Sequence, residues 1–386
     1  MALTTLPTAA FATGSVGTSQ LADGAVTTEK MKADVNFRNL IINGDMSIAQ
    51  RGTSTSGITG NGYAIDRYRH QITSAGTWTI SQSTDVPTGQ GFAYSQKLDC
   101  TTADASLGAS DRIRMTQRIE GNTLQSLKFG TSNAESITIS FWVKSNKTGT
   151  YSWSANDDQN TKLISASYTI DSANTWEKKT LTFAGTDSPS IGIDNTSFLQ
   201  CSWWLGTGST YSGGTYRSTW TTLADSDQAA GQTVNLADDT ANEWYITGVQ
   251  LEVGTSASDF EFLPYDVNLQ RCQRYYHQIG HGLNGAGGTV NAGQGQWYNS
   301  SEVTLTVYFP TSMRATPSMT TPTVSSGYRF HSAGSFVDVN DGGSISSPSN
   351  MMTGIYKSGL SGGSGGQASF LAMIASGASY KFDAEL

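Results

Sequence analysis

The chain has 386 residues, of which only 14% are charged, and it carries a formal net charge of −8 with a pI near 5.0. This length is sufficient for two or three domains that each bury a core. An acidic surface with few charges argues against nucleic acid as a partner, and against an anionic membrane surface, because both attract dense clusters of Lys and Arg.

The composition favours an all-β chain. Glycine is frequent (42 residues) and proline is rare (8), while Thr, Val, Ile, Tyr and Trp, which suit pleated strands, recur between turn residues. Cys100, Cys201 and Cys272 are too far apart for a disulfide framework or a metal knuckle, so we expect buried thiols in a protein made in a reducing cytoplasm. The start of the chain lacks the basic and apolar regions of a signal peptide, and no run of about 18 apolar residues predicts a membrane span.

Residues 1–36 contain a short repeat at an offset of ten positions. Its members are Gly14, Val16, Thr18 and Leu21, which recur as Gly24, Val26, Thr28 and Met31. One apolar residue every few positions cannot be buried within a single chain, so order here needs a partner surface. We therefore expect an attachment or oligomerisation segment that uses Val16, Leu21, Val26 and Met31; the alternative is a flexible linker.

Residues 37–265 alternate between short strand-like runs and turn residues. The clearest runs are Thr77–Ser81, Ser136–Lys144, Tyr151–Ala155 and Trp176–Phe183. Within the second run, Ile137, Ile139, Phe141 and Val143 share one face, as a half-buried strand requires. The pattern predicts an antiparallel β-sandwich, similar to a jelly roll.

The period changes in residues 266–280. Leu269, Cys272, Tyr275 and Tyr276 fall on one helical face there, which predicts a short connecting helix. Residues 281–386 return to alternation, most clearly in Glu302–Phe309, and predict a smaller C-terminal β domain.

Several segments resemble those of bacteriophage tail fibres and tail-associated structural proteins. They are NLIINGDMSIAQRG (Asn39–Gly52), YAIDRYR (Tyr63–Arg69), Trp244–Gln278, PTSMRATPSM (Pro310–Met319) and YKFDAEL (Tyr380–Leu386). The first three resemble the opening and closing strands of a β-sandwich similar to a carbohydrate-binding module.

This resemblance implies a non-catalytic virion protein, assembled in the host cytoplasm. It implies a homotrimer that joins other tail or capsid proteins through its N-terminal segment and binds host surface polysaccharide. Two alternatives remain open. One is a head fibre, capsid decoration or connector protein without receptor binding. The other is a polysaccharide depolymerase, although the long parallel β-helix that such enzymes usually carry is not visible in the sequence.

No catalytic motif competes with this interpretation. Gly362–Gly366 matches the G-x-S-x-G pattern around Ser364, but it lies in a low-complexity loop without the required flanking strand and helix. The pairs Asp157–Asp158 and Asp238–Asp239 place neighbouring carboxylates on opposite faces of a strand, which suits solvated turns better than a catalytic couple. We expect neither catalytic residues nor a cofactor.

Two groups of residues have the spacing or the ligand type of a metal site, and each also has a simpler interpretation. His277 and His281 have the i, i+4 spacing of a metal pair, but Gly280 interrupts the helix between them. Asn43, Asp45 and Glu252 could supply the oxygen ligands of a structural Ca²⁺, or Asn43 and Asp45 could form a turn. We predict no metal site.

Aromatic side chains in or near loops are the best candidates for ligand contact, because flat rings stack on the apolar faces of sugars. The predicted glycan-binding residues are Trp204, Tyr211, Tyr216, Trp220, Tyr328 and Tyr356. Tyr298, His331 and Phe336 also lie near loops of the C-terminal domain. The alternative is ordinary packing, since either Trp203 or Trp204 must face inward if that run is a strand.

Overall fold

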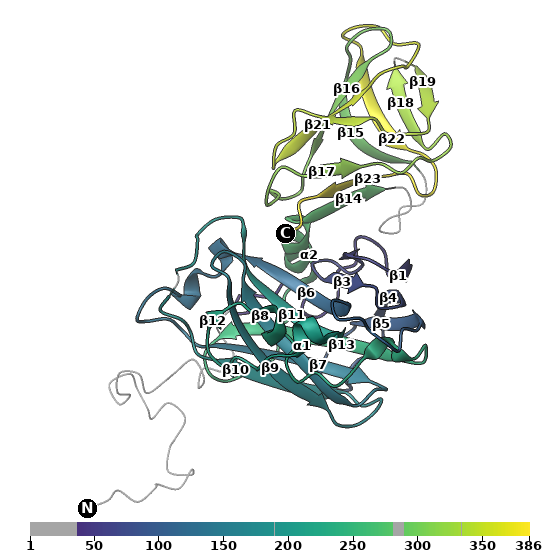
Figure 1. Cartoon of the computed structure of the whole chain (residues 1–386). Coiled ribbons are helices and arrows are strands. Elements are labelled where there is room, and N and C mark those ends of the chain that lie inside the picture. The colour runs from purple at the N-terminus through teal and green to yellow at the C-terminus, as the bar shows by residue number, and fades with distance from the viewer. Residues whose placement is uncertain (1–36, 189, 281–288, 333) are drawn as a thin grey trace, which may run out of the picture.

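Two antiparallel sheets face each other in the larger domain of the structure, which is a computed structural model that describes residues 37–188, 190–280, 289–332 and 334–386 (Figure 1). One sheet has the strand order β1 (Ser54–Ile58), β4 (Thr77–Ser83), β5 (Ser95–Thr102), β13 (Glu243–Val253), β7 (Ile137–Ser145) and β10 (Glu177–Phe183). The other has the order β12 (Thr221–Thr222), β9 (Lys162–Ile170), β8 (Gly149–Asp157), β11 (Ser197–Thr207), β6 (Arg112–Glu120), β3 (Arg69–Thr73) and β2 (Gly62–Tyr63).

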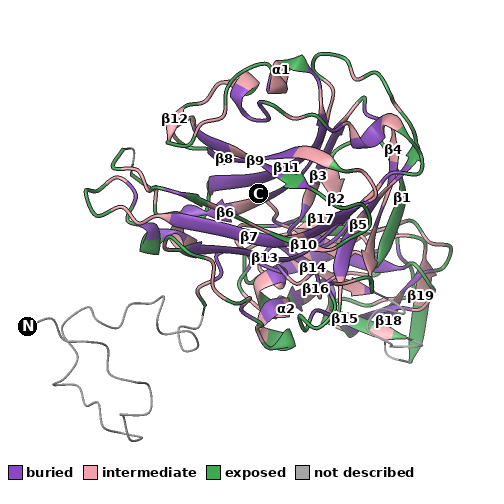
Figure 2. Cartoon of the chain, turned by 90° about the horizontal axis from the view of Figure 1, so that it is seen from below, coloured by how far each residue is buried: buried purple, intermediate pink, exposed green. Residues whose placement is uncertain are grey.

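The core of this domain lies between the two sheets, where Figure 2 shows buried strands. In β7, the predicted inward side chains Ile137, Ile139, Phe141 and Val143 are all completely buried. Phe141 meets the indole of Trp203 edge to face, with ring centroids 5.9 Å apart, and so links the two sheets. The predicted sandwich is therefore confirmed.

The segment Asn39–Gly52 was expected to be an opening strand, and this prediction is wrong. The backbone has positive φ at Asn43 (60°) and Met46 (58°), which a strand does not accommodate. The Asn43 side chain is buried and holds the turn, since its Nδ2 donates to the carbonyls of Ile48 (2.9 Å) and Asp66 (3.0 Å). The segment is a buried, irregular connection: two backbone hydrogen bonds join it to β13, at Leu40 and Gly44, and side chains satisfy several of its other polar groups.

One short helix, α2 (Tyr265–Gln273), follows the sandwich. It is shorter than the predicted 266–280, because the next residues form a strand, β14 (Tyr276–Gly280), which pairs with β23 (Ser379–Asp383). The hydrogen bonds of that pairing outweigh the helical periodicity of residues 275 and 276. Among the described residues, the other α-helix is the single turn α1 (Ser209–Ser212), and the 3₁₀ turns are η3 (Gly121–Thr123), η4 (Gln125–Leu127), η5 (Asp225–Asp227) and η6 (Leu236–Asp238).

The smaller domain also consists of two antiparallel sheets. A three-stranded sheet has the order β14, β23 and β17 (Ser318–Thr320). A seven-stranded sheet has the order β19 (Ser335–Val339), β18 (Tyr328–Ser332), β22 (Ala368–Met373), β15 (Val290–Trp297), β16 (Val303–Tyr308), β21 (Met352–Lys357) and β20 (Ser344–Ser346). In β16, Val303, Leu305 and Val307 are buried, which confirms the predicted alternation. The all-β class, with a sandwich, a short helix and a smaller β domain, is therefore confirmed.

The last residues of the chain return to the sandwich and join the domains; we call Ala384–Leu386 the terminal clasp. The amide of Ala384 donates to the carbonyl of Tyr275 (2.8 Å). The Glu385 carboxylate pairs with the buried guanidinium of Arg67 and lies 3.3 Å from that of Arg51. The clasp thus inserts a carboxylate of one domain into a buried arginine site of the other.

All three cysteines are free and buried, as predicted. No helix among the described residues is both long and apolar enough to cross a membrane. The predicted attachment residues Val16, Leu21, Val26 and Met31 lie outside the described residues, as does the rest of segment 1–36.

Candidate functional site

The sandwich aromatics that the sequence singled out mostly cover a sheet instead of forming an open platform. Trp204 is completely buried: its Nε1 donates to Ser154 Oγ (2.9 Å) and its ring lies 5.3 Å from that of Tyr211. Tyr211 is itself buried, and its hydroxyl is bonded to Arg112. The ligand role predicted for Trp204 and Tyr211 is therefore corrected to packing. The cause is the segment 208–235, which folds back over the outer face of β11.

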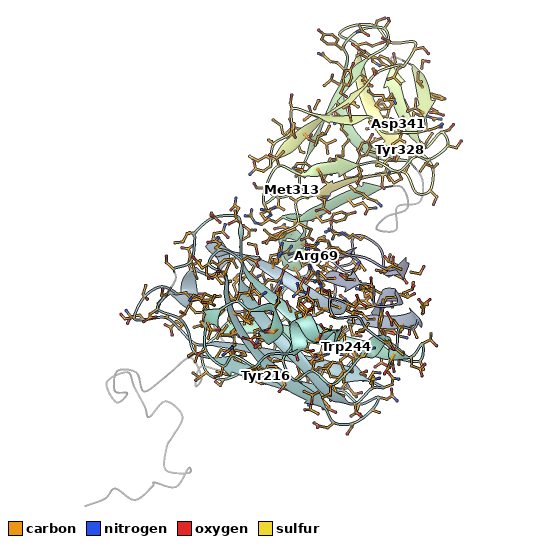
Figure 3. All side chains as sticks on the ribbon, in the orientation of Figure 1. Arg69, Tyr216, Trp244, Met313, Tyr328 and Asp341 are labelled. Atoms are coloured by element: carbon orange, nitrogen blue, oxygen red, sulfur yellow. The ribbon has the colours of Figure 1, made fainter. Side chains whose placement is uncertain are left out.

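Tyr216 and Trp220 are half-buried within the same covering segment; Figure 3 labels Tyr216 on this domain. The Tyr216 hydroxyl is 3.0 Å from Ser152 Oγ. Trp220 meets Phe129 edge to face (5.5 Å), and its Nε1 donates to the carbonyl of Ala184 (3.2 Å). Both half-buried rings therefore make packing contacts within the sandwich domain.

In the C-terminal domain, the prediction for Tyr328 is wrong. The ring is completely buried, and its hydroxyl donates to the carbonyls of Pro322 (2.8 Å) and Ser379 (3.1 Å), so it ties loops to the core. Tyr356 is half-buried, and its hydroxyl donates to Glu302 Oε1 (2.6 Å).

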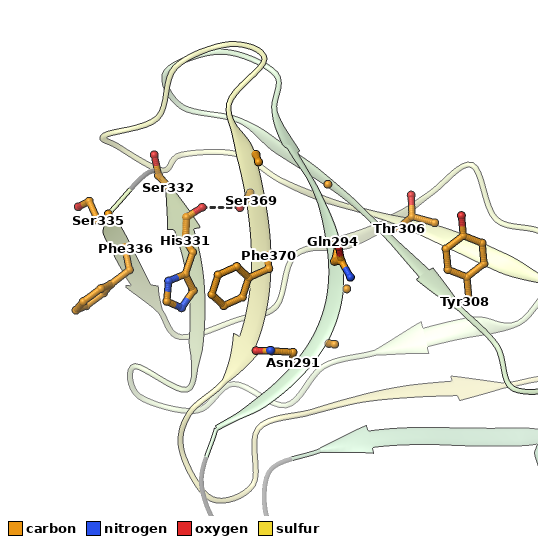
Figure 4. A pocket seen from close by; sticks show the side chains of 15 residues that line it. Asn291, Gln294, Thr306, Tyr308, His331, Ser332, Ser335, Phe336, Ser369 and Phe370 are labelled. Atoms are coloured by element: carbon orange, nitrogen blue, oxygen red, sulfur yellow. Dashed lines mark hydrogen bonds between the residues drawn. The ribbon is translucent and has the colours of Figure 1, made fainter.

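A hollow of about 1290 Å³ opens on the outer face of the seven-stranded sheet of the C-terminal domain, and we call it the sheet hollow (Figure 4). Strand register explains its composition, because residues paired across neighbouring strands share a face. His331 pairs with Phe336, while Gln294 pairs with both Phe370 and Thr306. One row across five strands therefore reads Phe336, His331, Phe370, Gln294 and Thr306, with rings at one end and polar groups at the other.

The aromatic end of the row is exposed and rigidly supported. The rings of His331 and Phe370 stack at 3.8 Å with an interplanar angle of 15°, and Phe336 is 50% exposed beside them. The carbonyl of His331 accepts hydrogen bonds from Trp297 Nε1 (3.0 Å) and Ser369 Oγ (2.6 Å). Desolvation and the nearby Arg329 guanidinium lower the pKa of His331, so the ring is neutral at pH 7.

The polar end offers uncharged hydrogen-bonding groups above a low floor. Asn291 and Gln294 expose their amides, and Tyr308 stands at the rim with 73% of its surface exposed. The floor consists of small residues, namely Ala292, Gly293, Gly295 and Ala368. The described residues that line the hollow include no Asp or Glu, so the lining holds no carboxylate pair of the kind that cleaves glycosidic bonds.

Sequence reasoning identified His331 and Phe336 by their position near loops, but it missed Phe370 and Gln294. A signal was present for Phe370. In β22, Ser369 and Leu371 are buried, so the alternation of the strand places Phe370 on the outer face. A large ring on that face does not contribute to the core, which indicates a contact with a ligand or partner.

The candidate catalytic and metal residues are not brought together. Ser364 is exposed in its loop, with its amide directed at Gln367. His277 lies in β14 rather than on a helix, and His281 lies outside the described residues. The acidic pairs serve turns: Asp157 accepts from the amides of residues 159 and 160, and Asp239 from that of residue 241.

The Ca²⁺ alternative is not supported by the contacts of its three residues. The side chain of Asn43 is already hydrogen-bonded within the turn described above, and Asp45 Oδ1 accepts from Asn268 Nδ2 (3.1 Å). Glu252 is held separately by Ser258, whose Oγ donates to Oε2 (2.6 Å). Within the described part of the chain, no three His, Cys, Asp or Glu side chains are grouped so that they could hold a metal ion.

No family model matches the sequence, and no curated protein matches it. Among solved structures, the enzymatically active domain of bacteriophage CBA120 tailspike protein 4 is similar, with 15% identity, a TM-score of 0.30 and coverage of 57% of this chain but only 22% of that one. TmCBM61 in complex with β-1,4-galactotriose has 11% identity, a TM-score of 0.28 and coverage of 56% and 99%. The family 11 carbohydrate-binding module of Clostridium thermocellum, in complex with a mixed-linked tetrasaccharide, has 8% identity, a TM-score of 0.25 and coverage of 53% and 98%. Similarities at these TM-scores are too low to support a function.

Proposed function

We propose that this chain is a non-catalytic glycan-binding protein of a virion, of the tail-fibre type, which attaches the particle to host surface polysaccharide. The sheet hollow carries the proposal, because exposed stacked rings, uncharged amides and hydroxyls line it together. The absence of Asp and Glu among its described lining residues supports binding without cleavage. The resemblance of several segments to phage fibre proteins supports the location on a virion.

The geometry suits a sugar for physical reasons. The apolar face of a pyranose can lie on Phe370, while the amides of Asn291 and Gln294 each offer a donor and an acceptor to neighbouring hydroxyls. Because Trp297 and Ser369 fix the backbone beneath His331, little side-chain or loop freedom remains to be lost on binding.

Homotrimer formation belongs to the same proposal. Three copies of a weak site on one particle raise the overall affinity through effective concentration, without new contacts. Sedimentation equilibrium of the full chain tests this part, with a mass three times 41.0 kDa as the expected result.

A structural role without receptor binding is the second candidate. Exposed apolar side chains at and near the rim favour it, among them Tyr308 and Met352, because such surfaces also form contacts between subunits. In that case the hollow is covered in the assembled particle and no glycan competes for it.

Phe370→Ala separates these functions. We expect it to weaken binding of the labelled full chain to a panel of bacterial surface polysaccharides about tenfold, which corresponds to ~1.4 kcal/mol for the lost ring contact. Tyr298→Ala is the matched control, because that ring is 72% exposed in the same domain but does not line the hollow. Equal binding by both variants, or a folded wild-type chain that binds no glycan, contradicts the proposal.

A further inference from the structure

A second group of polar side chains lies on the sandwich, on the outer face of its seven-stranded sheet. Strand register places three short hydroxyl side chains in line there, since Thr116 of β6 pairs with Ser202 of β11, and Ser202 pairs with Ser154 of β8. The alternate residues Met115 and Trp203 belong to the core, so these hydroxyls point away from it. All three side chains are almost completely buried, so they form a row of small polar groups beneath the surface rather than on it.

Three arginines surround Thr116 at one end of this row, and we call them the arginine cluster: Arg69, Arg114 and Arg118. Arg114 and Arg118 flank Thr116 on the same face of β6, and Arg69 of β3 pairs with Thr116 from the other side. Figure 3 labels Arg69 on the part of the sandwich nearest the C-terminal domain. The sheet thus holds three guanidinium groups around one short side chain.

Arg114 is a buried cation without a counter-ion. Its Nε donates to Gln71 Oε1 (2.6 Å), its Nη1 donates to Gln228 Oε1 (3.0 Å), and its guanidinium lies 4.6 Å from the centre of the Trp204 ring. No described carboxylate lies within 4.0 Å of it, and Nη2 has no hydrogen-bond partner although it is not enclosed. Burial, and repulsion from Arg112, lower its pKa to about 9.

Such an arrangement opposes folding, because a buried charge held only by neutral amides is poorly compensated. The neighbours add to the imbalance. Arg69 also has no described carboxylate within 4.0 Å, and only Arg118 has one, Asp158 at 3.3 Å. On a chain whose net charge is −8, this local excess of positive charge is unexplained by packing.

We propose that the arginine cluster binds the carboxylate of an acidic sugar, such as a uronic acid within a polysaccharide. A planar guanidinium matches a carboxylate with two parallel hydrogen bonds, and Arg114 Nη2 and Arg69 are the donors left without a protein acceptor. The buried amide oxygen of Gln200 accepts from Arg118 Nε (3.0 Å) and so holds that guanidinium beside the other two. This inference rests on the proposed function and deepens it by naming the class of glycan.

The overall charge argues against a nucleic acid at this place. A phosphate backbone needs an extended basic surface, whereas this chain is acidic and the cluster is a single spot. An acidic polysaccharide that carries one carboxylate in every few sugar units requires only a single cluster of this kind.

The test is calorimetric titration of the full chain with an oligomer of galacturonic acid and, separately, with the neutral galactose oligomer. We expect Arg69→Gln and Arg114→Gln each to weaken binding of the acidic oligomer by roughly tenfold or more, as for the loss of a hydrogen bond to a charged group. Lys178→Gln is the control, because it removes the same charge from an exposed position of β10 in the other sheet and should leave binding unchanged.

A thermal readout separates ligand binding from a structural role. The acidic oligomer is expected to raise the melting temperature of the wild-type chain but not that of Arg114→Gln. Without ligand, Arg114→Gln should melt at the same temperature as the wild type or higher, since an uncompensated buried charge has been removed. A marked loss of stability with unchanged binding overturns the inference, as does equal binding of a polyglutamate chain.

The outcomes also distinguish this inference from the proposed function. If only neutral glycans bind, and Phe370→Ala weakens that binding, the proposed function stands and the acidic-sugar site is rejected. If no glycan of either kind binds, both are rejected.

Discussion

Replacing Glu385 with alanine is expected to lower the free energy of unfolding by about 3–5 kcal/mol, because it leaves Arg67 buried without its partner. The Arg67 side chain is 1% exposed, lies 3.4 Å above the Tyr275 ring, and donates through Nη2 to the carbonyl of Arg118 (2.6 Å). Those contacts cannot neutralise its charge. Urea unfolding of the full chain measures the effect.

Asp383→Ala is the matched control for this prediction. Asp383 lies two positions earlier and contacts the same Arg51 (3.4 Å), but its side chain is 42% exposed, so its loss should cost less than about 1 kcal/mol. If Glu385→Ala changes stability as little as Asp383→Ala does, the terminal clasp does not depend on a buried ion pair, and our account of the domain contact is wrong.

The second large effect is a change in the free energy of unfolding at acid pH. His70 is buried, its Nδ1 has no hydrogen-bond partner, and desolvation together with Arg69 lowers its pKa to about 4, against an ordinary value of 6.5. The folded state therefore binds fewer protons than the unfolded state between these values, and stability is lost as the pH falls from about 6.5 towards 4. A difference of about 2.5 pKa units corresponds to ~3 kcal/mol.

An opposing contribution comes from Asp66, whose carboxyl has its pKa raised by burial to about 6, above the ordinary 3.8. There the folded state binds more protons, and stability is lost as the pH rises through 6. Variants are therefore compared with the wild type at each pH. His70→Gln should gain up to ~3 kcal/mol relative to the wild type between pH 7 and pH 4, and Asp66→Asn should lose a similar amount over the same range. Parallel pH profiles for all three chains contradict both assignments.

Patterns confined to neighbouring residues were sufficient to predict much of the fold. The alternation of Val303, Leu305 and Val307 predicted a strand with one buried face, and that of residues 137–143 did the same, because the period of two is a local property. The strand Tyr276–Gly280 was not predictable in this way. Its partner β23 lies about a hundred positions further along, and no local signal announces that pairing.

The candidate sites depend even more on distant contacts. Trp204 is an aromatic residue of the type that contacts sugars, but segment 208–235 packs over it. That contact joins residues distant in the sequence and is apparent only in the folded chain. Conversely, nothing in the sequence around Arg114 indicates that it lacks a carboxylate partner, since its hydrogen-bond acceptors, Gln71 and Gln228, are 43 and 114 positions away. The row across the sheet hollow is likewise assembled from five strands.

The position of Trp297 gives the two domains different fluorescence. Of the nine tryptophans, this one alone lies in the C-terminal domain, where it is completely buried and bonded to the carbonyl of His331 beneath the sheet hollow. The emission of the whole chain is therefore dominated by the sandwich, and its red shift on heating follows the unfolding of that domain. In a chain whose other tryptophans are replaced by phenylalanine, the remaining indole would report on the C-terminal domain alone.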